Sequence, residues 1–405
     1  MARVVSSLRA TLDQRIDIDD YLAWSTVVAA LLFIPVLPSV MLGYLIVIPN
    51  TLLLLALGRI AIHRNHLTAI ALLASFSLIG AHYAGTSPFA IVAQTVGITM
   101  TSVYFLNALV TFGISLPRWM EMYVRIAFIA ALLGFVQCLA ARLLHVGDGR
   151  LMSIYLEPSH YIFMTLPAIG YCISRYASDR RYGAEILVFG LSYVLADSSL
   201  GFLGLLLIGA FTFSSSLKTW QLLLAGIFLC SLTGALYLGS ANFRIRLDDT
   251  IRAIATQDLG GTNASTFALL SNVYVTGRSF SAHPLTGVGI GGYAQVYDAY
   301  IGTLSGPGLV FLSGGLNRDD ANSLFLRVAA ELGVPGLLVL FGFLIVCARV
   351  RAPPYQIIRN ALLPYLLIRM GRFGAYFSVE FYFFVGIYIL NYMQSRAARK
   401  VAEKT

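Results

Sequence analysis

Long apolar stretches leave this chain few ways to fold. A helix that crosses a bilayer needs about 20 mostly apolar residues, and about twelve stretches of the chain come close to that requirement. They cover residues 21–37, 40–58, 67–84, 88–112, 121–141, 160–176, 184–197, 200–215, 219–238, 322–347, 357–371 and 376–393. Hydrophobic residues make up 58% of the 405 residues and charged residues only 12%, whereas soluble domains carry about 25% charged residues. We therefore expect an all-α polytopic membrane protein in which residues 1–405 form a single membrane domain.

Basic residues predict the orientation of the chain, because the cytoplasmic loops of membrane proteins retain Lys and Arg. Clusters of these residues occur at 3–15, 59–64, 118–125, 175–181, 349–359 and 396–404. Placing the clusters inside puts both termini in the cytoplasm. The four cysteines fall in or beside separate apolar stretches, and we expect neither a disulfide nor a metal site from them.

Arginine accounts for every Lys-or-Arg position on the opposite side of this topology. These positions are Arg142, Arg150, Arg244, Arg246, Arg252, Arg278, Arg318, Arg327, Arg369 and Arg372. The planar guanidinium group grips phosphate or carboxylate through two parallel hydrogen bonds and always stays charged. The set predicts an external binding site for a group with several negative charges, such as a lipid pyrophosphate. The alternative is that these are ordinary residues of the membrane interface.

The segment 239–321 is the longest one between apolar stretches, and we expect it to form a large external loop. Its residues 240–261 and 265–281 have the pattern of two helices, of which the first is amphipathic. The sequence "GVGIGGY", residues 287–293, lacks the strand and helix that flank a dinucleotide fingerprint, so we interpret it as a tight glycine turn. We expect neither a nucleotide nor a nucleic-acid partner.

Charged residues at the start of an apolar stretch mark a candidate site. The sequence "SGGLNRDDANSLFLRVAAELGVPGLL", residues 313–338, carries five of them: Arg318, Asp319, Asp320, Arg327 and Glu331. Asp319 and Asp320 fit either acid–base catalysis or capping of the helix that follows. Arg327 and Glu331 are four residues apart and also fit an ion pair along that helix.

Three more ionisable residues are candidates for catalysis. Glu157 fits either a base or the cap of the next span, and His283 fits either a base or an ordinary loop residue. Glu380 lies in the apolar sequence "YFSVEFYFF", where an ionisable group indicates function by default. An ion pair with Arg369 or Arg372 is the structural alternative for Glu380.

Several of these segments follow one another in a familiar order. The sequence "HPLTGVGIGGY" precedes "NSLFLRVAAELGVPGLLVL", and upstream lie "GRLMSIYLEPSHYIFMTLPAIGY" and "LADSSLGFLGLLLIGA". This order, over about residues 145–390, resembles the family of O-antigen ligases and Wzy-type polysaccharide polymerases. The segment with "EPS" is similar to the exopolysaccharide and capsule polymerase branch.

The resemblance implies a GT-C-like membrane glycosyltransferase of the bacterial inner membrane, with 239–321 as its periplasmic loop. Its substrates would be oligosaccharides linked to undecaprenyl pyrophosphate, and its partners would be membrane lipids, a chain-length regulator and a flippase. Ligases of the family carry a histidine where this chain has Ala321, and an arginine common in the family is replaced here by Leu200. The departure at Ala321 favours a polymerase of O-antigen or exopolysaccharide.

The expected chemistry is transfer of a nascent glycan from its lipid pyrophosphate to another lipid-linked repeat unit. Arginines would stabilise the departing pyrophosphate without a metal or another cofactor. For this role we expect Arg150, Arg246, Arg278, Arg318, Arg327 and Arg372. The candidate catalytic residues are Glu157, Asp319, Asp320 and Glu380, and the candidate acceptor-binding residues are Asn322 and His283. Glu157 is favoured as the base, with Asp320 orienting the acceptor.

Two other functions stay open on the sequence alone. A ligase would transfer the glycan to a lipid A core or to a protein. A transporter or flippase would move the lipid-linked sugar across the membrane. Transporters commonly show paired repeats and broken helices near the midplane, whereas the polar residues of this chain gather on one side, which argues against transport.

Overall fold

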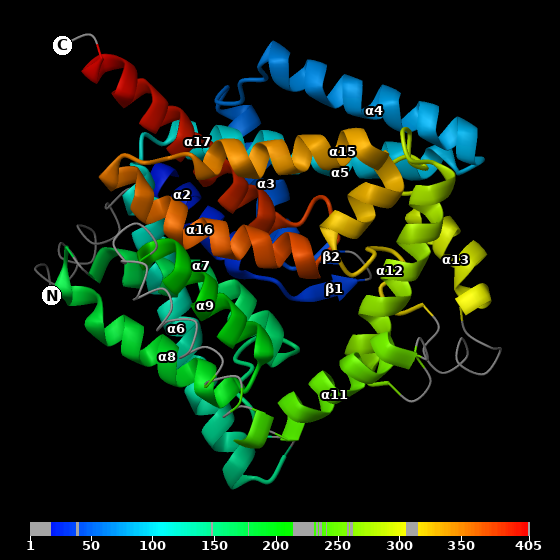
Figure 1. Cartoon of the computed structure of the whole chain (residues 1–405). Helices are drawn as coiled ribbons and strands as arrows, with labels where there is room; N and C mark the ends of the chain where they lie inside the picture. The colour runs from blue at the N-terminus through cyan, green and yellow to red at the C-terminus, as the bar shows by residue number, and fades with distance from the viewer. Residues whose placement is uncertain are drawn as a thin grey trace, which may run out of the picture.

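The computed structural model describes residues 18–37, 40–146, 149–176, 178–213, 231, 234, 237–239, 241–256, 259, 262–304 and 315–403, which are almost entirely helical (Figure 1). The helices are α2 (Ile18–Leu31), α3 (Tyr44–Ala56), α4 (Arg64–Ala84), α5 (Pro88–Thr111), α6 (Leu116–Leu143), α7 (Pro158–Tyr176), η1 (Arg180–Tyr182), α8 (Gly183–Ala196), α9 (Ser199–Phe213), α11 (Ala241–Thr256), α12 (Ala264–Ala282), α13 (Tyr293–Leu304), α15 (Leu324–Ala348), α16 (Pro353–Arg372) and α17 (Val379–Ala402). Strands β1 (Pro35–Leu37) and β2 (Val40–Met41) form a short antiparallel pair after α2.

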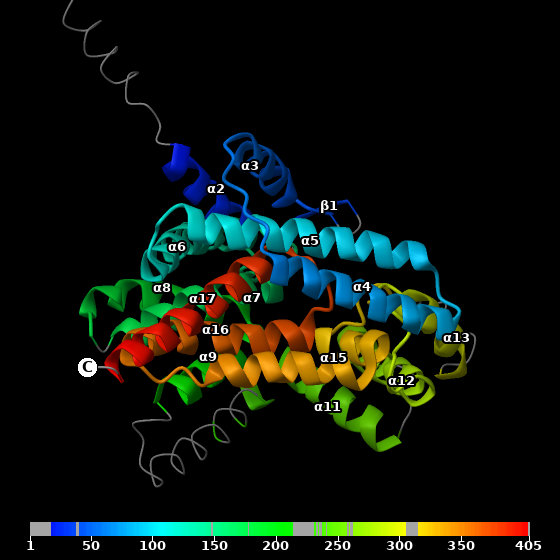
Figure 2. The same ribbon diagram turned by 90° about the horizontal axis from the view of Figure 1, so that it is seen from above.

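Among the described helices, α4, α5, α6 and α15 are long and apolar enough to cross a membrane. Helix α4 packs against both α5 and α15, as the view from above shows (Figure 2). Large apolar side chains on these helices are exposed, including Leu72 at 65%, Val136 at 66% and Val339 at 74%. Soluble proteins rarely expose extended apolar surface. The all-α fold class is confirmed over the described residues, and these exposed surfaces support a membrane protein.

Helix α7 lies at the centre of the packing and contacts α6, α8, α9 and α16. Small residues allow this close approach. A Cβ atom added at Gly170 would lie 3.0 Å from the Cα of Ala361 in α16, and one added at Gly204 in α9 would lie 2.5 Å from the Leu166 side chain. The rings of Phe163 and Phe373 are 4.5 Å apart. The first turns of α7 are therefore held beside the end of α16.

The expected glycine turn at 287–293 is confirmed. Gly287, Gly289 and Gly291 have left-handed φ angles of 60°, 81° and 83°, which glycine adopts without steric cost. A Cβ atom added at Gly287 would lie 2.3 Å from backbone atoms of Glu331 in α15. The absence of side chains is thus what lets the turn touch the backbone of α15.

Helix α15 is kinked where it meets this turn. Gly333 has φ 62° and ψ −154°, which is not helical. The nearby carbonyls of Ala330 and Glu331 accept hydrogen bonds from the backbone N–H groups of Val288 and Gly289, at 3.1 and 2.9 Å. The glycine turn thus supplies hydrogen-bond donors to the carbonyl groups that the break in α15 leaves without helical partners.

Most expected spans coincide with helices, with two exceptions. The expected span 21–37 is shorter than predicted, because α2 ends at Leu31 and residues 35–37 form β1; Pro35 has no N–H group to continue a helix. The expected span 219–238 lies largely outside the described residues. Within 239–321, the two expected helices correspond to α11 and α12, and α13 follows the glycine turn.

Candidate active site

A cavity of about 950 Å³ lies where the start of α7, the start of α12, the end of α16 and the turn before α15 meet. It is lined by Phe33, Met41, Arg150, Met152, Leu156, Glu157, Pro158, Ser159, His160, Ser198, Asn263, Ala264, Ser265, Ala268, Leu316, Asn317, Asp320, Asn322, Arg372 and Phe373. The wall combines two arginines, two carboxylates, amides and hydroxyls with apolar side chains such as Phe33, Leu156 and Phe373. Five of the residues expected from the sequence are brought together here: Arg150, Glu157, Asp320, Asn322 and Arg372.

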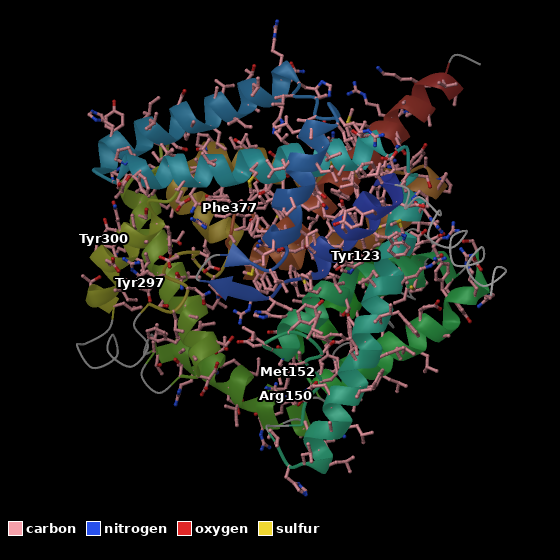
Figure 3. The ribbon with its side chains drawn as sticks, turned by 180° about the vertical axis from the view of Figure 1, so that it is seen from behind. Tyr123, Arg150, Met152, Tyr297, Tyr300 and Phe377 are labelled. Carbon is pink, nitrogen blue, oxygen red and sulfur yellow. The ribbon has the colours of Figure 1, made fainter. Side chains whose placement is uncertain are left out.

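The two arginines reach the cavity from different elements. Arg150 lies in the segment between α6 and α7, beside Met152 (Figure 3). Arg372 is the last residue of α16, and its guanidinium group donates to the hydroxyl of Ser265 at 2.5 Å and to Oδ1 of Asn322 at 3.5 Å. Each guanidinium group can donate hydrogen bonds to an anionic ligand in the cavity.

The two carboxylates are held by local hydrogen bonds. Glu157 precedes α7, and its Oε2 accepts a hydrogen bond from the hydroxyl of Ser159 at 2.9 Å. Oδ1 of Asp320 accepts from Nδ2 of Asn317 at 3.0 Å and from the backbone N–H of Asn322 at 3.1 Å. The N-cap of α15 is Ser323, whose side chain accepts a hydrogen bond from the backbone N–H of Leu326. Asp320 therefore does not cap the helix, and its hydrogen bonds stabilise the turn that precedes α15.

The turn that carries Asp320 has an unusual backbone. Asn317, Ala321 and Asn322 have φ angles of 56°, 59° and 56°, in the left-handed region that side chains other than glycine seldom adopt. The turn packs tightly on the segment after α16, where a Cβ atom added at Gly374 would lie only 1.4 Å from the carbonyl oxygen of Asp320. Such strain clusters at functional sites, where the surrounding packing maintains it.

Two cavity residues carry buried polar atoms without a hydrogen-bond partner. The side chain of Asn322 is 4% exposed, and its Nδ2 is unpaired. Nδ1 of His160 is also buried and unpaired. An unpaired buried polar group costs free energy, so each such group requires an explanation. The sequence alone does not indicate His160, Asn263, Ser265 or Asn317 as site residues, because these residue types are common in loops and at helix ends.

Arg327 and Glu380, expected in the site, lie instead in buried ion pairs. Nε of Arg327 is 3.2 Å from Oε1 of Glu331, and this predicted pair is confirmed. Arg327 also donates to the carbonyl of Gly374 at 3.1 Å. Arg369 and Glu380 form the second predicted pair, with Nε and Oε1 3.2 Å apart and the side chains 0% and 2% exposed. Neither pair lines the cavity.

Arg318 and Asp319, also expected in the site, are at the surface. Arg318 donates to Asp298 of α13 at 2.7 Å and to Asp319 at 3.2 Å. The side chain of Asp319 is 76% exposed. The hydrogen bond from Arg318 lowers the pKa of the Asp298 carboxyl below its usual range. These three residues do not line the cavity.

The last three expected residues lie on the segment 239–321. Arg278, on α12, packs over the ring of Tyr274 and donates to its hydroxyl at 3.3 Å. His283 lines a separate hollow of about 220 Å³, together with residues of α13 such as Tyr300, which lies away from Arg150 in Figure 3. Arg246 is on α11, and its side chain lies outside the described part of the structure.

The described residues contain no group of three or more His, Cys, Asp or Glu side chains placed to hold a metal ion. In comparisons with known proteins, no family model matches the chain, and no curated protein matches it. The chemistry of the cavity is therefore the observation that indicates a function.

Proposed function

We propose that this chain is a polysaccharide polymerase that acts on lipid-linked oligosaccharides. It transfers a nascent O-antigen or exopolysaccharide chain from undecaprenyl pyrophosphate to the non-reducing end of another lipid-linked repeat unit. The observation that carries the proposal is the cavity of about 950 Å³ in which Arg150 and Arg372 share one wall surface with Glu157, Asp320 and Asn322.

The composition of the cavity fits the two demands of glycosyl transfer. Breaking the bond between the anomeric carbon and the pyrophosphate leaves negative charge on phosphate oxygens, and fixed guanidinium groups stabilise such charge without reorganisation. The acceptor hydroxyl must lose a proton during attack, which requires a base within hydrogen-bond reach. Arg150 and Arg372 are suited to the first task, whereas Glu157 and Asp320 are candidates for the second. In this proposal the reaction needs neither a metal nor another cofactor.

The amides and hydroxyls of the same wall are suited to sugar. Asn263, Asn317 and Asn322 come from the start of α12 and from the strained turn. The unpaired Nδ2 of Asn322 is a buried donor with no protein acceptor, and a hydroxyl of the acceptor sugar would satisfy it once the amide turns toward the cavity. Asn322 therefore keeps its proposed role in acceptor binding.

The proposed setting is the bacterial inner membrane. The chain would cross it about twelve times in a GT-C-like arrangement, with both termini in the cytoplasm and with 239–321 at the periplasmic face. A flippase would deliver the lipid-linked repeat units, and a chain-length regulator would set the polymer length. The helices long and apolar enough to cross a membrane support membrane insertion.

Reconstitution tests the proposal. The purified protein in lipid nanodiscs is supplied with lipid-linked repeat units alone, and the products are separated by size. We expect a ladder of polymer that still forms in EDTA. A ladder that appears only with a lipid A core or a protein acceptor would identify a ligase. Movement of intact lipid-linked sugar across a vesicle membrane without bond formation would identify a flippase, and either result would replace the polymerase.

A further inference from the structure

His160 lines the cavity, and its Nδ1 makes no hydrogen bond within the protein. It lies in the first turn of α7, and its ring packs edge-on against Phe33, with centroids 5.2 Å apart, and at a tilt against Phe373, at 5.8 Å. These contacts fix the plane of the ring, and a phenylalanine would make them equally well. Nδ1 is buried and has no hydrogen-bond partner. The imidazole group is therefore not explained by packing.

The ring lines the cavity together with all the charged groups identified there. These groups are Arg150 before α7, Glu157 at its start, Asp320 in the turn before α15 and Arg372 at the end of α16. Since Nδ1 is buried, Nε2 is the ring nitrogen that a ligand in the cavity can reach. One oxygen of each cavity carboxylate, by contrast, already accepts hydrogen bonds from the protein, namely Oε2 of Glu157 and Oδ1 of Asp320.

We propose that His160 is the general base of the transfer reaction, an assignment that rests on the proposed function. The acceptor hydroxyl oxygen forms the new bond to the anomeric carbon while its proton passes to Nε2 of His160. The bond between the anomeric carbon and the pyrophosphate breaks, and its electron pair stays on the phosphate oxygen beside Arg150 and Arg372. The proton on Nε2 leaves to solvent before the next cycle.

The chemistry of imidazole suits this role better than that of an ordinary carboxylate. Imidazole titrates near pH 6.5, so it is neutral and able to accept a proton at about pH 7. Burial and the positive charge of Arg372 favour the neutral ring that accepts the proton, whereas Glu157, three residues earlier, supplies a negative charge that favours the ring once it is protonated. In this assignment Glu157 is a positioning residue, and Asp320 maintains the turn that presents Asn322.

Two substitutions separate catalysis from packing. His160→Phe retains a ring for the contacts with Phe33 and Phe373, whereas His160→Asn retains a polar group without the ring. Each variant is compared with the wild type in the nanodisc assay, with thermal unfolding and donor binding measured on the same samples. We expect both variants to lose about 100-fold or more in transfer rate, which is within the range for removal of a general base. Donor binding is expected to persist in both.

The pH profile gives a readout that a packing role would not change. Only the neutral ring accepts a proton, so wild-type kcat/KM should fall as the pH drops through the imidazole pKa, and this acid limb should vanish in both variants. A His160→Phe variant with the wild-type rate, or an unchanged acid limb in either variant, would overturn the assignment alone. Absence of any transfer by the wild type would overturn the proposed function, and the assignment with it.

Discussion

Two neighbouring arginines at the end of α16 have contrasting surroundings. Arg369 is fully buried, pairs with Glu380 and donates to the carbonyls of Phe373 and Ala375. Arg372, one turn later, lines the cavity and donates to Ser265 and Asn322. The same side chain thus belongs to the packing at one position and to the candidate site at the next.

The same contrast holds for two other arginines that were expected to bind pyrophosphate. Arg327 resembles Arg369, because it is 5% exposed, pairs with Glu331 and lies over the ring of Tyr376 at 4.5 Å. Arg150 resembles Arg372, because it lines the cavity. Both groups consist of arginines, and the sequence predicts both on the same side of the membrane. The contacts of the two groups differ, because Arg327 and Arg369 each pair with a buried carboxylate and donate to backbone carbonyls, whereas Arg150 and Arg372 line the cavity.

Breaking a buried pair should have the largest effect. In Glu331→Ala the guanidinium group of Arg327 keeps its charge but loses its carboxylate, and removing one member of a buried pair costs about 3–5 kcal/mol. Arg369→Ala should cost a similar amount, because Glu380 would stay buried without its partner. The free energy of unfolding in detergent micelles checks both variants.

The matched control is the exposed pair of Arg399 and Glu403, whose side chains are 82% and 59% accessible. Arg399→Ala should change stability by less than about 1 kcal/mol. If Glu331→Ala unfolds as readily as this control, Arg327 does not depend on the pair, and the separation into two groups of arginines fails.

Substitution by lysine should distinguish the cavity group by activity. Lysine keeps the charge but cannot form the two parallel hydrogen bonds of a guanidinium group to phosphate. We expect Arg150→Lys and Arg372→Lys to lose about 100-fold in transfer rate, equivalent to about 2.7 kcal/mol of transition-state stabilisation, with normal unfolding. Arg278→Lys, at an exposed site over Tyr274, is the control and should stay near the wild-type rate. Full-length polymer from both cavity variants would remove the arginines from the mechanism.

The sequence was sufficient to predict most of the described helices and one local ion pair. Apolar stretches located the helices, and the spacing of Arg327 and Glu331 predicted a pair because residues four apart share a helix face. The glycine turn was predictable from composition, since clustered glycines favour left-handed backbone. These features depend on residues close together in the chain.

The membership of the cavity was less predictable, because it depends on contacts between distant segments. His160 enters the site because α7 packs against the end of α16, and Asn322 because a strained turn docks against Gly374. Arg318 is expected from the sequence as one of the external arginines that would bind pyrophosphate, yet Asp298, on α13, holds it at the surface. The kink in α15, by contrast, has a local cause, because Pro335 has no N–H group for the carbonyl of Glu331, which accepts instead from the N–H of Gly289 in the glycine turn.

A smaller effect is expected at the strained turn, with opposite signs for stability and activity. Asn322 has a φ angle of 56° and an unpaired, buried Nδ2. Asn322→Gly relieves the left-handed backbone strain and removes the unpaired buried amide, so we expect the free energy of unfolding to rise by about 1 kcal/mol. Transfer should fall by about tenfold, since one hydrogen bond to the acceptor is lost. Loss of stability together with activity would show that Asn322 holds the turn and has no separate role in binding.

The smallest effect is expected at the surface pair of Arg318 and Asp298, where the side chains are 41% and 53% accessible. Arg318 lowers the pKa of Asp298, so the pair stabilises the fold above the unfolded carboxyl pKa of about 3.9, and this contribution disappears as the pH falls through the lower folded value. Solvent screening keeps the contribution under about 1 kcal/mol. Asp298→Asn should therefore unfold slightly more readily than the wild type at about pH 6, and the difference should vanish at about pH 2.

The activity of an Arg318 variant tests whether this surface arginine takes part in the reaction. Arg318→Lys keeps a charge beside Asp298 and should transfer glycan at nearly the wild-type rate, in contrast to Arg372→Lys. If Arg318→Lys instead loses transfer while its unfolding is normal, Arg318 must leave Asp298 and reach the ligand during the reaction. The division between the two groups would then depend on ligand binding as well as on the fold, because an exposed pair is weak enough for a pyrophosphate to displace its carboxylate.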